Sequence, residues 1–209
     1  MDLTTVDYLL MTTRTVRKRL DLTRPVPHTI IQQCIELATQ APAGGNISQY
    51  HFVVVTNPAK RAGLAALYRK AYFEYYWPRQ QEHLRANPRF SASTTYLAEH
   101  LHEVPVHIIP CFDQRVEREA AFLQATWYGC ILPAVWSLML ALRARGVGAS
   151  WTTLHLLYEK EAAALLGIPA HCTQAALLPV AYFTGTDFKP AKRVPGRERT
   201  YWDTWGQTR

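Results

Sequence analysis

Residues 117–151 read EREAAFLQATWYGCILPAVWSLMLALRARGVGASW, and this stretch decides the expected architecture. Apolar side chains recur every three or four residues from 123 to 142, which predicts a helix over 117–145. Apolar residues also occupy its other faces, so the helix should be central and buried. Pro133 should bend or divide the helix, and Gly146 should end it.

The segments on either side of this helix favour an α+β fold. Asn57 followed by Pro58 is a typical helix start, because Asn caps the first turn and Pro fits within it. Helices and strands do not alternate in a clean β-α-β series, which argues against a doubly wound sheet. Strands are predicted at 50–56, 104–112 and 174–184, and helices at 4–11, 30–38, 58–71, 93–103 and 159–166. In the first helix, the spacing of Thr4 and Asp7 suggests a capping box.

The amino-acid composition limits the number of domains and the kinds of partner that we expect. A chain of 209 residues with 48% hydrophobic residues suits one domain, here 1–209, with a real core. Lysine and arginine exceed aspartate and glutamate by 23 to 16, a net charge of +7. Such a balance suits an anionic partner: a nucleic acid, an anionic membrane or a phosphorylated small molecule.

Cysteine spacing and the N-terminus predict a soluble cytoplasmic protein. The four cysteines form no C-x-x-C pair, which argues against a zinc site or a redox dithiol and predicts buried, reduced thiols. The N-terminus lacks the pattern of a signal peptide. The longest apolar run, 131–142, is shorter than the ~20 residues that a membrane span needs. We therefore expect no membrane and no metal.

Two segments stand apart from the expected core. Residues 72–90 crowd five aromatic side chains before a polar stretch, which suggests a mobile cover or an excursion. The polar, basic tail 186–209 carries Trp202 and Trp205. Because exposed tryptophans are costly, the tail should pack against another subunit.

Common catalytic motifs are missing from the sequence. There is no G-x-G-x-x-G, no phosphate-binding G-x-x-x-x-G-K-[ST] and no G-x-S-x-G. His100 and His102 diverge on a helix and are expected to be solvated surface. Basic residues and aromatics are not interleaved on one evident surface, so a nucleic-acid-binding module is a remote alternative.

Three clusters of basic and polar residues remain. Arg14, Thr15 and Arg17 lie on a non-helical segment, and two guanidinium groups beside a hydroxyl make a compact anion clamp. The small residues of the loop 42–49 let backbone approach a flat ligand. Lys192 and Arg193 form the third cluster, in the tail. Each cluster alone is a weak signal, because basic runs and turns are common on surfaces.

In combination, these clusters resemble the FMN-dependent nitroreductase family. The matching segments are Arg14–Arg17 (RTVR), Pro25–Pro27 (PVP), Ala41–Phe52 (APAGGNISQYHF), Gly146–Trp151 (GVGASW) and Pro190–Arg193 (PAKR). Their order and spacing are more specific than any one of them. The resemblance implies a three-layer α-β-α fold with a mostly antiparallel central sheet, a long central helix, and a homodimer with FMN at the subunit interface.

The resemblance also assigns roles to residues. Arginines would grip the phosphate of FMN, the loop with Asn46 would reach the flavin edge, and residues after Gly148 would lie near the ring or ribityl chain. The usual family glutamine aligns with Ser48, so Ser48 or Gln49 replaces it. The expected FMN contacts are Arg14, Thr15, Arg17, Asn46, Ser48, Gln49, Trp151, Thr152, Thr153, Lys192 and Arg193. For Trp151, core packing is an equally good interpretation.

The implied reaction needs no catalytic side chain. NAD(P)H would reduce FMN, and a small flat electrophile such as a nitroaromatic or quinone would then be reduced in a ping-pong cycle. Dehalogenation, flavin destruction, reduction of activated double bonds or aldehydes, and non-enzymatic flavin storage or sensing stay open as alternatives.

Overall fold

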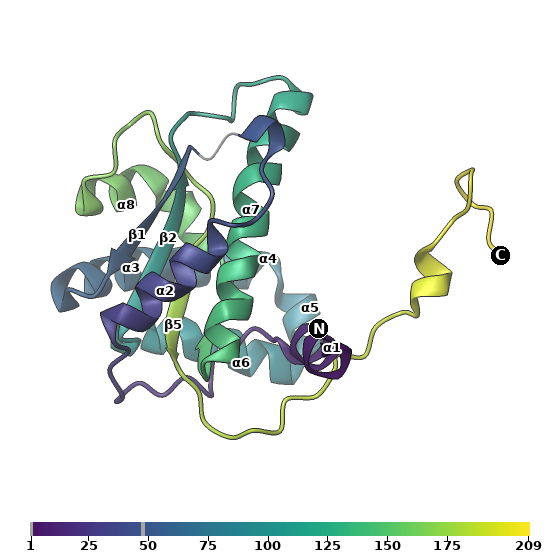
Figure 1. The fold of residues 1–209 in the computed structure, drawn as a ribbon. Helices are drawn as coiled ribbons and strands as arrows, with labels where there is room; N and C mark the ends of the chain where they lie inside the picture. Colours follow the sequence, from purple (N-terminus) through teal and green to yellow (C-terminus); the bar gives the residue numbers. More distant parts are fainter. Residues whose placement is uncertain (1, 47–48) are drawn as a thin grey trace.

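The computed structural model describes residues 2–46 and 49–209 (Figure 1). Its centre is a five-stranded antiparallel sheet in the order β1-β2-β5-β3, with the short β4 beside β2. The strands are β1 (Tyr50–Val55), β2 (Val106–Phe112), β3 (Val147–Ala149), β4 (Thr173–Gln174) and β5 (Leu178–Tyr182). β2 pairs with β1, β4 and β5, so it is the central strand.

Helices cover both faces of this sheet, which confirms the three-layer α-β-α prediction (Figure 1). The α-helices are α1 (Leu3–Thr12), α2 (His28–Ala38), α3 (Pro58–Lys70), α4 (Trp77–Arg79), α5 (Gln81–Ala86), α6 (Pro88–His100), α7 (Ala121–Ala144) and α8 (Glu159–Leu166). α2 and α7 pack on the face that carries Ile108, whereas α3, α6 and α8 pack on the face that carries Ile109. Successive side chains of β2 point to opposite faces of the sheet, so β2 contributes to two separate hydrophobic cores.

Short helical turns complete the chain. They are η1 (Gly44–Asn46), the π-helical η2 (Ala71–Tyr76), η3 (Leu101–Glu103), η4 (Leu154–Tyr158) and η5 (Gly196–Arg199).

α7 is the long helix that the sequence predicts, although it begins at Ala121 and runs unbroken through Pro133. Of the two expected effects of Pro133, the division is wrong, and the bend stays a prediction. The carbonyl that loses its hydrogen bond belongs to Gly129, a solvent-exposed residue, so water can replace the missing donor. By length and mean hydropathy (1.5) α7 would also qualify as a membrane span, contrary to the expectation from the run 131–142. Here it is a core helix, with Val135 and Leu138 fully buried against the sheet.

Several local expectations can be compared with the structure directly. Asn57 caps α3 by accepting a hydrogen bond from the backbone of Lys60 at 3.1 Å, as predicted. The capping box at Thr4 is wrong, because Asp2 caps α1 instead by accepting from the backbone of Thr4. The predicted strand 174–184 is split into β4 and β5: the amide of Ala175 still donates to Pro110 of β2, but Leu177 pairs with Thr152 in the loop after β3.

Residues 72–90 are mostly helical, within η2, α4, α5 and the start of α6. Tyr72 is fully buried, and its hydroxyl bonds the hydroxyls of Thr94 and Thr95 at 3.0 and 2.9 Å. The expectation that this segment lies outside the core is therefore wrong for Tyr72. Whether the segment covers a ligand stays a prediction.

The tail leaves the body of the protomer, and Figure 1 shows the C-terminus well away from the sheet. Trp205 is 88% exposed, and Tyr201 and Trp202 are exposed as well. All four cysteines are free and buried, as predicted.

Candidate functional site

The segment Arg14–Arg17 is fixed beside the end of the long helix. The backbone amide of Val16 donates to the carbonyl of Ala149 at 3.0 Å, just after β3. The side chain of Val16 packs on Gly148, where an added Cβ would lie 3.1 Å from Val16 Cβ. This close approach explains the glycine at 148 and sets where the two arginines leave the chain.

Arg17 is a partly buried cation without a counter-ion. Its guanidinium lies 5.6 Å from the ring centre of Phe90 and close to the phenols of Tyr68 and Tyr76. Burial lowers the pKa of Arg17, because it removes water from the charged group. In the described part of the chain, no carboxylate is within ion-pair distance of Arg17. Such a cation calls for an anionic ligand.

Thr152 joins the same neighbourhood from the loop after β3. Its hydroxyl donates to the phenolic oxygen of Tyr68 at 3.3 Å, and its backbone exchanges two hydrogen bonds with Leu177. Burial raises the pKa of Tyr68, so the phenol stays protonated. We call Arg17, Tyr68 and Thr152 the Arg17 cluster. Tyr68 is a member that the sequence patterns gave no reason to single out.

Trp151 and Thr153, the other two residues expected near the flavin ring or its ribityl chain, differ in their surroundings. Trp151 is half-buried and packs against the core beneath α7, which agrees with its core-packing interpretation. Thr153 is exposed.

The tail passes Arg14 before it leaves the protomer. The Arg14 guanidinium donates to the carbonyl of Lys189 at 3.4 Å, and Thr15 is exposed beside it. Lys192 and Arg193 are exposed, and neither makes a hydrogen bond or ion pair with the residues that the structure describes. The structure therefore brings the start of the tail to Arg14 but does not bring Arg193 there.

The loop of the second predicted cluster lies elsewhere. Gly44 packs against Thr126 and Cys130 in the first half of α7, and Asn46 is exposed with a left-handed φ of 58°. Gln49 is exposed, and its carbonyl accepts from the amide of Asp113 at 2.9 Å. Ser48 lies outside the described residues, so the choice between Ser48 and Gln49 stays open.

The two halves of the predicted site are thus separated along α7. Gly44 contacts Cys130, whereas Val16 contacts Gly148, beyond the helix end at Ala144. At a rise of about 1.5 Å per residue, Cys130 lies about 20 Å along the helix axis from Ala144, the last residue before the turn into β3. Among the described residues, no hydrogen bond or ion pair joins the Asn46 loop to the Arg17 cluster.

Comparison with known proteins identifies the family of this chain. The model of the nitroreductase family matches residues 10–182, which is most of the chain. The chain belongs to the nitroreductase family. This membership confirms the resemblance drawn from the sequence motifs, and residues 10–182 include Arg14, Arg17, Asn46 and Thr152.

Individual relatives are distant but cover most of the chain. A putative NADH dehydrogenase/NAD(P)H nitroreductase of Methanothermobacter thermautotrophicus is 25% identical over 175 residues, 83% of this chain and 74% of that one. Among solved structures, iodotyrosine deiodinase bound to FMN and 3-iodo-L-tyrosine has a TM-score of 0.74 at 21% identity, covering 94% and 100% of the two chains. A BluB-like flavoprotein of Clostridium difficile has a TM-score of 0.73 at 18% identity, covering 98% and 100%.

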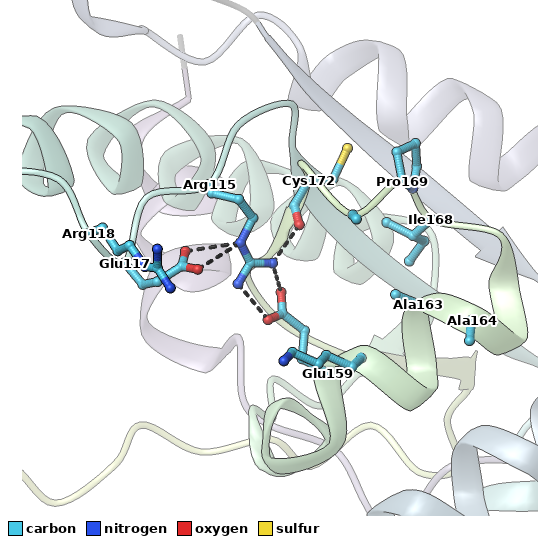
Figure 2. A pocket seen from close by; sticks show the side chains of 11 residues that line it. Arg115, Glu117, Arg118, Glu159, Ala163, Ala164, Ile168, Pro169 and Cys172 are labelled. Carbon is cyan, nitrogen blue, oxygen red and sulfur yellow. Dashed lines mark hydrogen bonds and ion pairs between the residues drawn. The ribbon is translucent and has the colours of Figure 1, made fainter.

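A separate cavity of about 640 Å³ opens beside α8 (Figure 2). Figure 2 shows the guanidinium of Arg115 at its wall, paired with both oxygens of Glu159 at 2.9 and 3.0 Å and also with Glu117. The carbonyl of Cys172 accepts a further bond from Arg115. Because four of its five N–H donors are engaged, Arg115 here is a structural link rather than a free anion receptor.

Proposed function

We propose that this nitroreductase-family protein is an FMN-dependent oxidoreductase that uses NAD(P)H to reduce small flat electrophiles such as nitroaromatics or quinones. The observation that carries the proposal is Arg17: a partly buried guanidinium with no carboxylate partner in the described chain, within the range that the family model matches. A phosphate group would supply the missing counter-charge.

The donors around Arg17 fit a phosphorylated cofactor. Arg14 and Arg17 offer planar, permanently charged groups, and Thr15 adds a hydroxyl between them. Within residues 2–46 and 49–209, Arg14 makes one long hydrogen bond, to Lys189, which leaves most of its donors for a ligand. Lys192 and Arg193 lie in the tail, three and four residues beyond Lys189. They would add positive charge around the phosphate. When bound, FMN supplies the centre that accepts a hydride from NAD(P)H and passes electrons to the oxidant.

A homodimer would unite the two halves of the site. α7 exposes Phe122 (71%), Tyr128 (37%) and Trp136 (38%), so part of its apolar surface has no partner within the protomer. Burying that surface against a second copy would be favourable, at about 25 cal/mol per Å² of apolar area. In such a dimer the Asn46 loop of one chain would approach the Arg17 cluster of the other. The exposed tryptophans of the tail would pack on the partner.

Residues of the segment 72–90 would shape the substrate space. Tyr76 and Phe90 both lie beside Arg17, so aromatic walls stand next to the proposed phosphate end of the cofactor. Flat aromatic substrates pack well against such walls. The protein's own side chains would bind and orient the reactants and exclude water, because no proton donor is required among them for hydride transfer.

The test is flavin content and turnover of the purified full-length protein. We expect yellow protein, or colourless protein that takes up added FMN, and oxidation of NADH or NADPH when a nitroaromatic or quinone is present. Arg17→Ala should lose FMN, whereas Lys18→Ala, an exposed charge next in sequence, should keep it. Protein that cannot be loaded with FMN contradicts the proposal.

The same assay separates the alternatives. Binding of FMN without oxidation of either nucleotide would indicate storage or sensing. Turnover with a halogenated aromatic but no nitroaromatic or quinone would indicate dehalogenation. We also propose a cytoplasmic location, to which four free thiols are well suited.

A further inference from the structure

We propose that His51, Asp113, His171 and Cys172 form a binding site for a divalent transition-metal ion of the zinc type. The metal site does not depend on the proposed flavin function, although Gln49, an expected FMN contact, bonds the backbone of Asp113. The expectation of no zinc considered only cysteine pairs close in sequence, and this set has a single cysteine and residues from three distant segments.

Sheet pairing brings the four residues together. β1 and β2 pair with His51 opposite Cys111, and the amide of Asp113 bonds the carbonyl of Gln49 one step beyond the strand. His51 and Asp113 are therefore diagonal neighbours on one face. On the other side, β2 pairs with β4 so that Phe112 faces Thr173, and the same register sets Cys172 opposite Asp113.

Their ligand atoms already converge. His171 Nε2 lies 2.8 Å from Asp113 Oδ1, and Cys172 Sγ lies 3.5 Å from the same oxygen. One ligand atom from each of these three residues lies within 4.8 Å of the other two. His51 Nε2 approaches the second carboxylate oxygen, Oδ2, at 3.9 Å and can supply a fourth ligand.

These distances suit a tetrahedral ion. Zinc bonds of about 2.0–2.3 Å to nitrogen, oxygen and sulfur place tetrahedral ligands about 3.3–3.6 Å apart. The contact between Cys172 and Asp113 is already in that range, and the contact between His171 and Asp113 needs a shift of about half an ångström. His51 lies nearer to the other carboxylate oxygen, so its ring must turn toward the ion. The imidazoles are exposed enough to turn, with side-chain exposures of 64% for His51 and 65% for His171. Two imidazoles, a carboxylate and a thiolate are ligands that zinc accepts.

The charges balance as well. A carboxylate and a thiolate neutralise a doubly charged cation, and the imidazoles are neutral. Binding requires the Cys172 thiol to release its proton to solvent, because the thiolate is the ligand. Cys172 is only 7% exposed and closes the site on the inner side, while Asp113 is 43% exposed and leaves a path for the ion. The bound ion would link β1, the end of β2 and the turn before β4.

The experiment uses metal-free full-length protein titrated with Co²⁺, which reports coordination through its visible spectrum. We expect one ion per chain, with tetrahedral d–d bands and a thiolate charge-transfer band. Spectra are taken as differences against the same sample with excess Zn²⁺, so any flavin absorbance cancels, and Zn²⁺ should abolish the Co²⁺ bands.

Variants assign the ligands. Cys172→Ser should remove the charge-transfer band, and His171→Ala should weaken Co²⁺ binding at least 10-fold, since even indirect partners of a metal contribute that much. His171 is exposed, so its variant should fold even if Cys172→Ser does not. The matched control is His102→Ala, which changes an exposed histidine beside a carboxylate, Glu103, and should leave binding unchanged. Absence of stoichiometric Co²⁺, or equal loss in the His102 and His171 variants, would overturn the proposal and leave a simple surface ion pair.

Discussion

The hydroxyl of Thr152 donates to the buried phenolic oxygen of Tyr68 at 3.3 Å, which joins the loop after β3 to α3. Tyr68 lies beside Arg17, so this bond helps to hold the phenol next to that guanidinium. The bond has no local sequence signal, because its partners are 84 positions apart.

Tyr68→Phe removes this hydrogen bond and keeps the ring. We expect a loss of about 1 kcal/mol in the free energy of unfolding, because Thr152 loses its acceptor in a partly buried place. Loss of FMN affinity should be smaller than in Arg17→Ala, since Tyr68 acts by positioning. Denaturant unfolding and flavin titration measure the two effects. FMN affinity lower than that of Arg17→Ala would assign Tyr68 a direct contact instead.

Arg14→Ala and Arg193→Ala should each weaken FMN binding by about 10- to 150-fold, the cost of one charge-assisted hydrogen bond to phosphate. Arg193 makes no contact in the described protomer, so its effect depends on the tail reaching a cofactor site. Fluorescence titration with FMN gives both affinities, and Lys18→Ala is the control. Unchanged affinity in both variants would refute the phosphate roles.

Gly148→Ala should displace the segment Arg14–Arg17. Its new Cβ would lie 3.1 Å from Val16, tighter than ordinary contact, and we expect a loss of about 1–3 kcal/mol in stability. Gly196→Ala is the matched control, because a Cβ there meets nothing within 4 Å. Thermal unfolding compares the two. Equal melting temperatures would show that Val16 moves aside without cost.

Trp136→Glu should turn a dimer into a monomer, because it places a charge on the exposed apolar side of α7. Leu157→Glu changes a similarly exposed residue, 44% against 38%, outside that helix and should leave the dimer intact. Sedimentation measures the mass in solution. A dimer that persists in Trp136→Glu would place the interface elsewhere.

Acid should destabilise the fold through His107 and His155. Both are fully buried, and burial lowers the pKa of each to about 4 from the usual 6.5. Below pH 6.5 the two imidazoles bind protons in the unfolded chain but stay neutral in the folded chain. The free energy of unfolding therefore falls until about pH 4 and then levels off. The loss should be a few kcal/mol per histidine. Urea unfolding between pH 7 and pH 4 measures it, and His107→Gln should flatten part of the slope.

Local patterns predicted much of the fold. The helical spacing of α7, the Asn57 cap and the β-branched composition of β1 are each contained in a few consecutive residues, and the structure confirms them. Pro133 shows the limit. A helix that buries one face against a sheet can lose one hydrogen bond on its exposed side, and only the packing reveals which side that is.

The candidate site was predictable to the extent that family motifs mark it. Arg14 and Arg17 were identified from a short motif, but Tyr68 was not, because its place beside Arg17 arises from the packing of α3 on the sheet. The set of His51, Asp113, His171 and Cys172 was missed for the same reason. Its members meet only through strand register, which the spacing of residues in the sequence does not reveal.

The Asn46 loop lies beside the first half of α7 and the segment Arg14–Arg17 lies beside β3, and this placement has a thermodynamic consequence. If each flavin draws its contacts from both chains, cofactor uptake and subunit association become linked equilibria, and each strengthens the other. Dilution would then release the flavin, and excess FMN would hold the pair together. In a mixture of Arg17→Ala and Asn46→Ala chains, the mixed pair would carry one intact site and one doubly defective site, so activity would return through complementation between two inactive proteins.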